Sequence, residues 1–87
     1  MYDTKLDGRT CRAARAFLNW SSRQLSIEAK VSVASIYDLE RGRPVDRRSA
    51  QMLALAFADA GVEIIERGGR AIGVRESETA SAEHARA

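Results

Sequence analysis

Basic side chains are concentrated in the first half of this 87-residue chain. Residues 9–48 contain nine lysines and arginines against four acidic residues, a net charge of +5, whereas residues 76–87 contain three glutamates and one arginine, a net charge of −2. Guanidinium and ammonium groups gathered in this way attract a polyanion. The pattern therefore predicts either a polyanionic partner or simply a solvated basic surface.

The residue types that support enzymatic or metal chemistry are not arranged for it. The sequence has no Ser/His/Asp set, no carboxylate pair in an apolar setting and no glycine loop suited to cradle phosphate. His84 has no ligand-type neighbours, and the single cysteine, Cys11, cannot form an internal disulfide. We therefore expect a protein that is not an enzyme, holds no cofactor or metal and binds no small-molecule ligand.

The cellular location is predicted from the same features. A lone cysteine is typical of the reducing cytoplasm. No stretch of the sequence has the length of a membrane span, and the first residues lack the apolar run of a signal peptide. We expect a cytoplasmic protein without membrane contact.

Four helices must position these side chains. Their apolar spacing predicts helices over 8–19, 22–29, 33–41 and from Asp46 or Ser49 to about Ala60. The expected N-caps of the first three helices are Asp7, Ser21 and Ser32, and Gly42 ends the third helix before Pro44. The residues expected to face inward are Cys11, Ala14, Leu18, Leu25, Ala29, Ile36, Leu39, Ala50, Leu53, Ala56 and Phe57.

The apolar period changes after Gly61. Residues 62–75 hold two β-branched runs around Gly68-Gly69, which predicts a β-hairpin. Residues 76–87 contain Ser, Ala and Glu without a large apolar residue, which predicts a disordered tail. The expected organisation is therefore a flexible N-terminus (1–6), a helical domain (7–61), the hairpin (62–75) and the tail (76–87).

The second and third helices have the spacing of a helix-turn-helix motif. About eight residues of helix, a turn of about three and a helix of about nine form this arrangement. Val31 joins the inward residues of both helices in one shared face, and Ser26 lies where the helices approach closely and a small residue is required. Helix pairs of this length also occur in purely structural bundles, so the spacing leaves both interpretations open.

The segment "RAARAFLNWSSRQLSIEAKVSVASIYDLERG" (12–42) resembles the lambda-repressor-like, Cro/XRE-type helix-turn-helix family. The similar features are an Arg/Ala-rich first helix ending in a tryptophan, the pattern S-x-x-x-L-S-x-x-A-x-V-S, and an Ile-x-x-Leu-Glu-Arg-Gly ending. The residues from Phe57 onward are similar to the tail of short single-domain bacterial members, so the resemblance covers about residues 8–75. It implies a mainly α fold of four to five helices and a bacterial, nucleoid-associated regulator of transcription, usually a repressor or autoregulator, that binds double-stranded DNA.

Two positions depart from the pattern of this family. Its turn between the second and third helices usually holds glycine, because one residue there has positive φ, whereas this chain has Lys30. Its base-reading positions correspond here to Ser32, Val33, Ala34 and Asp38, with Tyr37 beside them. None of these side chains can make the bidentate arginine–guanine or glutamine–adenine contact.

These side chains still offer modest readout. Val33 and Ala34 can contact a thymine methyl group, Ser32 or Ser35 can bond either base type, and Asp38 can accept from a cytosine amino group while repelling phosphate. Tyr37 is predicted either to contact phosphate or sugar or to be a half-buried helix residue. Affinity must then come from the DNA backbone. The expected backbone contacts are Ser22, Arg23, Gln24, Arg41 and Arg43. Lys30 is predicted either to reach a phosphate or to be a solvated lysine.

The resemblance also implies roles for residues outside the turn. Arg15 and Glu40 match positions that often form an ion pair between the first helix and the end of the recognition helix. Trp20 is expected in the core at a helix junction, and Cys11 is expected to be an inert small hydrophobe.

The hairpin is predicted to join two chains. An isolated two-stranded hairpin is marginal in water, and its apolar residues exceed what one small core obviously needs. Pairing of two hairpins would bury the residues Val62, Ile64, Ile65, Ile72 and Val74. A two-fold dimer would set its recognition helices about 34–36 Å apart and require an inverted-repeat operator. The alternative is a hairpin folded onto the fourth helix of its own chain.

Two other functions remain possible at this point. One is a protein-interaction module, such as an anti-activator, that keeps the fold but has lost the groove chemistry; Asp38 and the missing base readers favour it. A module that binds RNA or neutralises a toxin differs mainly in its partner.

Overall fold

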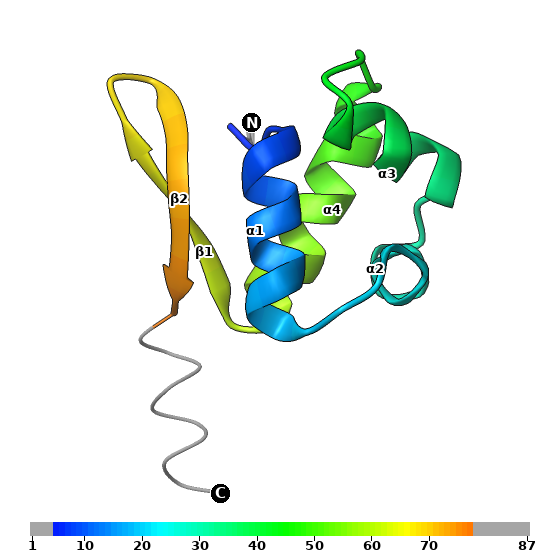
Figure 1. Ribbon diagram of the computed structural model, residues 1–87, viewed down its shortest axis with the longest axis horizontal. Helices are drawn as coiled ribbons and strands as arrows, with labels where there is room; N and C mark the ends of the chain where they lie inside the picture. The colour runs from blue at the N-terminus through cyan, green and yellow to red at the C-terminus, as the bar shows by residue number, and fades with distance from the viewer. Residues whose placement is uncertain (1–4, 78–87) are drawn as a thin grey trace, which may run out of the picture.

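The computed structural model describes residues 5–77, which form four helices and a C-terminal antiparallel hairpin (Figure 1). The helices are α1 (Gly8–Leu18), α2 (Ser22–Ala29), α3 (Val33–Glu40) and α4 (Arg47–Asp59). The strands are β1 (Val62–Arg67) and β2 (Arg70–Glu76). The four helices and the hairpin predicted from the sequence are therefore confirmed. No helix in the described part of the chain has the length and apolar character needed to cross a membrane.

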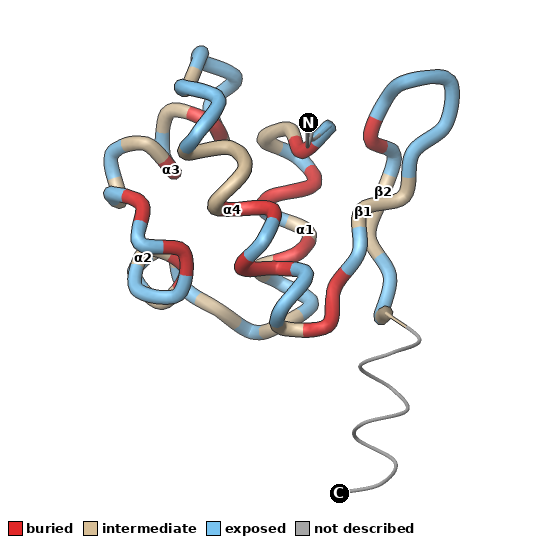
Figure 2. Tube along the Cα trace, turned by 180° about the vertical axis from the view of Figure 1, so that it is seen from behind, coloured by how far each residue is buried: buried red, intermediate tan, exposed pale blue. Residues whose placement is uncertain are grey.

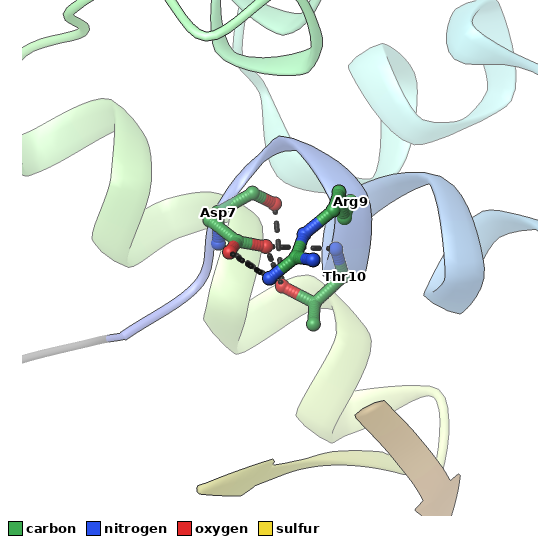
Figure 3. A network of polar contacts seen from close by, with 3 residues as sticks. All are labelled: Asp7, Arg9 and Thr10. Atoms are coloured by element: carbon green, nitrogen blue, oxygen red, sulfur yellow. Dashed lines mark hydrogen bonds and ion pairs between the residues drawn. The ribbon is translucent and has the colours of Figure 1, made fainter. Parts of the chain in front are cut away.

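Short polar side chains start every helix. Asp7 caps α1 in a capping box: its Oδ1 accepts from the Thr10 N–H at 2.9 Å, and Thr10 Oγ1 accepts from the Asp7 N–H at 3.0 Å (Figure 3). Ser21 and Ser32 cap α2 and α3 as predicted. Asp46, the first of the two candidates, caps α4. Each such cap satisfies backbone donors that the first helical turn leaves unpaired.

Residues with positive φ end the first three helices. Asn19 (φ 59°) follows α1, Lys30 (φ 58°) follows α2, and Gly42 (φ 79°) stands one residue after the Arg41 C-cap of α3. Because Asn19 and Arg41 are C-caps, α1 and α3 each end one residue earlier than predicted.

The core lies where the inner faces of the four helices and the start of β1 meet, as the buried segments in Figure 2 show. Its largest fully buried side chains are Phe57, Leu25, Ile36, Leu53, Val62 and Cys11. Trp20 packs half-buried against this core, and its ring stacks on Phe57 with centroids 6.2 Å apart. The prediction that Ala50 is buried is wrong: it is half-buried, whereas Ala54 is buried.

Two boundary predictions also need correction. Leu6 was assigned to a flexible N-terminus, but it is 7% exposed and belongs to the core. Glu76 was assigned to the disordered tail, but it pairs with Val62 as the last residue of β2. Residues 1–4 of the predicted flexible segment and residues 78–87 of the predicted tail lie outside the described residues.

The hairpin turns at Gly68 and Gly69, whose φ values of +60° and +78° match a two-residue turn with left-handed conformation at both positions. The register pairs Ile64 with Val74 and Ile65 with Gly73, and an irregularity follows Ile65. This β-bulge leaves Ile72 without a cross-strand partner, so Ala71 faces inward at 3% exposed and Ile72 is 52% exposed.

The hairpin packs on its own chain. β1 contacts α4 and α1, and β2 contacts α1 (Figure 1). The hairpin therefore folds back onto α1 and α4 of its own chain, and its pairing with a second chain stays a prediction.

Candidate nucleic-acid interface

The turn between α2 and α3 is held by one serine. Ser26 Oγ donates a hydrogen bond to the Val31 carbonyl at 2.6 Å, and the Ser26 carbonyl accepts from the Lys30 N–H at 2.8 Å. Lys30 adopts the left-handed conformation that glycine usually supplies, at a cost of roughly 1–2 kcal/mol. The bonds from Ser26 help to hold this conformation. The Ser26 hydroxyl therefore contributes a hydrogen bond that holds the turn.

The surface of α3 that faces away from the core is partly exposed. Ala34 and Tyr37 are exposed, and Val33, Ser35 and Asp38 are half-buried. In Figure 1 the view runs along α2 while α3 lies across it, so the two helices cross steeply. This arrangement leaves the side chains predicted to read bases on one accessible surface.

Hydroxyl groups at the start of α3 bond to each other. Ser32 Oγ accepts from the Ser35 N–H at 3.1 Å and donates to Ser35 Oγ at 3.0 Å. A contact of Ser32 with a base would therefore compete with its capping role. Val33 and Ala34 carry no such conflict, so they are the simplest candidates for contact with thymine methyl groups.

Arginines after α3 fold back over its acidic and aromatic side chains. The Arg41 guanidinium lies 5.6 Å from the centre of the Tyr37 ring, and Arg43 Nη1 lies 3.7 Å from Asp38 Oδ1. The Arg43 N–H also donates to the Asp38 carbonyl at 2.8 Å. The negative charge of Asp38 is thus partly balanced, which reduces its repulsion of phosphate.

The start of α2 exposes one cation. Arg23 is exposed, whereas Ser22 and Gln24 are half-buried. The Gln24 N–H donates to Ser21 Oγ, and its side-chain amide donates to Glu28 Oε2 at 2.8 Å. Of the three residues predicted here, Arg23 offers the most accessible side chain. Lys30 is exposed in the following turn.

The predicted ion pair between α1 and α3 is confirmed. Arg15 Nε and Nη2 each donate to a Glu40 carboxylate oxygen at 2.8 Å, with side chains 20% and 9% exposed, respectively. Arg15 Nη1 also donates to the Trp20 carbonyl at 3.2 Å. Burial alone would raise the pKa of Glu40, but hydrogen bonds from Arg15 and Cys11 and the positive charges of Arg15 and Arg12 outweigh it and lower that pKa. The pair fixes the end of α3 against α1.

Three further residues complete this α1–α3 junction. Arg12 Nη1 donates to the Glu40 carbonyl. A Cβ atom on Gly8 would lie 2.5 Å from the Leu39 carbonyl oxygen, so only glycine allows this close approach. Cys11 is fully buried beside Glu40, and burial together with a hydrogen bond to Glu40 raises the pKa of its thiol.

Sequence reasoning missed the roles of Gly8 and Arg12. Arg12 lies one helical turn before Arg15, and this spacing was an available signal. Glycine as the first residue of a helix is common, so Gly8 carried no comparable signal.

The residues predicted for dimerisation fall into two groups. Val62 is 1% exposed in the core, and Ile64 and Val74 pack half-buried against it. Ile65 is half-buried on the outer face of the hairpin, and Ile72 is exposed. Val62 therefore offers no surface to a second chain, which corrects its assignment to the dimer contact.

Comparison of the chain with protein-family models and with curated proteins finds no match. Residues 5–77 also contain no group of three or more His, Cys, Asp or Glu side chains placed to hold a metal ion.

Proposed function

We propose that this protein is a lambda-repressor-like, Cro/XRE-type transcriptional regulator, a repressor or autoregulator that binds an inverted-repeat operator in double-stranded DNA as a homodimer. One observation carries the proposal. The Arg15–Glu40 ion pair holds α3 against α1, and α3 follows a three-residue turn after α2 with Ala34 and Tyr37 exposed on its surface. A helix fixed on one side and open on the other is suited to enter a major groove.

The chemistry of the exposed face supports affinity more than strong sequence readout. Val33 and Ala34 supply contacts to thymine methyl groups. Phosphate contacts come from the exposed cations Arg23, Lys30, Arg41 and Arg43. Binding should therefore depend strongly on salt, and two half-sites would compensate for modest readout in each.

The test is a titration of duplex DNA from just upstream of the protein's own gene, followed by fluorescence anisotropy at several salt concentrations. We expect Arg41→Ala to weaken binding to all sequences and to reduce the slope of log K against log salt by about 0.9. The matched control is Arg67→Ala, because Arg67 is also exposed but lies next to the hairpin turn. Absence of binding to any duplex at low salt would refute the proposal.

A second candidate is a protein-interaction module, such as an anti-activator or antitoxin, with weak or no DNA binding. The mutual bonding of Ser32 with Ser35 and of Asp38 with Arg43 favours it, because it occupies polar groups at the base-reading positions. Failure to bind DNA together with co-purification of a stoichiometric protein partner, lost on Asp38→Arg, would select this function.

A further inference from the structure

α3 carries one stripe of exposed and half-buried side chains on the side opposite its buried residues Ile36 and Leu39. The members of the stripe recur at the spacing of a single helical face and are Ala34, Tyr37, Asp38 and the C-cap Arg41. The Arg41 guanidinium lies over the Tyr37 ring. Ala34 and Asp38 remain as a neighbouring pair one helical turn apart, and this pair offers a base one methyl group and one carboxylate.

The carboxylate of Asp38 is available to a hydrogen-bond donor. Its side chain is 44% exposed, and Arg43 Nη1 lies 3.7 Å from its Oδ1, too far for a hydrogen bond. Within residues 5–77 this carboxylate accepts no hydrogen bond. Because phosphates and base acceptors repel a carboxylate, Asp38 fits a major groove only where a base donates to it.

Cytosine is the base that satisfies this carboxylate. In the major groove only cytosine N4 and adenine N6 present donor hydrogens, and adenine places its N7 acceptor beside the amino group. Guanine and the O4 atom of thymine oppose the carboxylate with acceptors. Asp38 therefore selects cytosine, whose outward edge has a donor and no acceptor.

Ala34 is placed to contact the C5 side of the same base. Side chains four residues apart on a helix have Cβ atoms about 5–6 Å apart. C5 and the N4 amino group are neighbours on the pyrimidine ring, so one cytosine can contact both Ala34 and Asp38. Unmodified cytosine has only a hydrogen atom at C5. A methyl group there would make with Ala34 the apolar contact that alanine makes with thymine.

We propose that α3 reads 5-methylcytosine, with Asp38 accepting a hydrogen bond from N4 and Ala34 packing on the C5 methyl group. 5-Methylcytosine presents an outward donor and a methyl group side by side, whereas thymine combines its methyl group with an acceptor. This inference rests on the proposed DNA binding and names the form of DNA that the same surface prefers. Methylation of operator cytosines then raises the occupancy of the operator by this protein.

Two other methylated bases do not fit the same pair of side chains. In a base pair, the methyl group of N4-methylcytosine or of N6-methyladenine takes the outward position on the amino nitrogen, because the remaining hydrogen is used in the pair. The outward donor is then lost, and Asp38 has no partner. 5-Methylcytosine keeps both hydrogens of its amino group.

The test starts from duplexes that the full chain selects from a randomised library of unmethylated DNA. The selected half-site should contain a cytosine that Asp38→Ala no longer requires. This cytosine is then replaced by 5-methylcytosine, and the dissociation constant is measured by fluorescence anisotropy. We expect binding to tighten about fourfold for one half-site and about fifteenfold for both, as burial of one methyl group per half-site gives. N4-methylcytosine should weaken binding, and thymine should weaken it by at least about fivefold.

Two variants separate the two contacts. Ala34→Gly should abolish the gain from the C5 methyl group but still distinguish cytosine from thymine. Asp38→Ala should keep the gain and bind 5-methylcytosine and thymine duplexes alike. Ala16→Gly is the matched control, because Ala16 is an exposed alanine within α1. It carries a similar loss of helix propensity and should keep the full gain.

Equal affinity of the wild-type chain for cytosine and 5-methylcytosine duplexes overturns the proposal, and so does a gain that survives in Ala34→Gly. A selected site without a cytosine that depends on Asp38 overturns it as well. Each of these results leaves the proposed function intact, because unmethylated duplexes are still bound. Absence of binding to any duplex, methylated or unmethylated, refutes the proposed function and this inference together.

Discussion

The two sides of α3 differ in how strongly they are fixed. On the inner side, Glu40 accepts hydrogen bonds from Arg15 and Arg12. Gly8 allows the backbones of α1 and α3 to approach closely. On the outer side, the pair of Arg43 with Asp38 is long and solvent-exposed, with side chains 64% and 44% exposed. This contrast shows that buried, bidentate contacts fix the position of α3. Its outer surface has only weak contacts, which a ligand can replace at low cost.

The largest expected effect comes from breaking the inner contact. Glu40→Ala should destabilise the fold by about 3 kcal/mol, because it leaves the mostly buried guanidinium of Arg15 without its carboxylate. A double-mutant cycle with Arg15→Ala, followed by urea unfolding, isolates the coupling. A coupling energy near zero would mean that the inner side is no more tightly fixed than the outer side.

Replacing Gly8 with alanine should destabilise the fold, although alanine has the higher helix propensity. Alanine is the better helix former by about 1 kcal/mol, yet Gly8→Ala should destabilise the fold by about 2 kcal/mol, because its Cβ meets the backbone of Leu39. Urea unfolding measures the change. A more stable Gly8→Ala chain would show that α1 and α3 separate easily.

The inner pair also predicts a pH dependence. The pKa of Glu40 is lowered from its ordinary value of 4.5 in the folded chain, so the unfolded chain binds a proton more readily. The stabilisation is therefore present above pH 4.5 and is lost as the pH falls through the folded-state value. The free energy of unfolding of the wild-type chain and of Glu40→Gln, measured at a series of pH values from 7 to 3, gives this stabilisation. Parallel curves for both chains would argue against it.

The smallest expected effect on stability lies on the outer side. Arg43→Ala or Asp38→Ala should change the free energy of unfolding by less than about 1 kcal/mol, because the pair is exposed. In DNA binding the two should differ: Arg43→Ala weakens all sequences alike, whereas Asp38→Ala relaxes the preference among sequences. Equal effects of both variants on every duplex would show that Asp38 does not take part in sequence readout.

The fold was largely predictable because its signals are local. The caps at Asp7, Ser21 and Ser32 and the glycine pair of the hairpin act through adjacent backbone groups, so sequence spacing reveals them. The Arg15–Glu40 contact spans 25 residues and was expected only through the family resemblance.

The features that escaped prediction depend on three-dimensional packing. Regular alternation sets Ile72 on the same face as Val74, but the bulge at Ile72 leaves it unpaired and 52% exposed, while Ala71 is buried. Leu6 and Gly8 depend on where α1 meets the rest of the chain, and no local pattern encodes that position.

The most direct test of the central claim is a map of backbone amide shifts on adding the operator duplex, by heteronuclear NMR. We predict that the changes concentrate at residues 22–24, 30–38 and 41–43, while the inner junction at residues 8–15 and the hairpin turn stay close to their free values. Changes confined to the hairpin, or no change at saturating duplex, would contradict the assignment of the outer face of α3 as a DNA-binding surface.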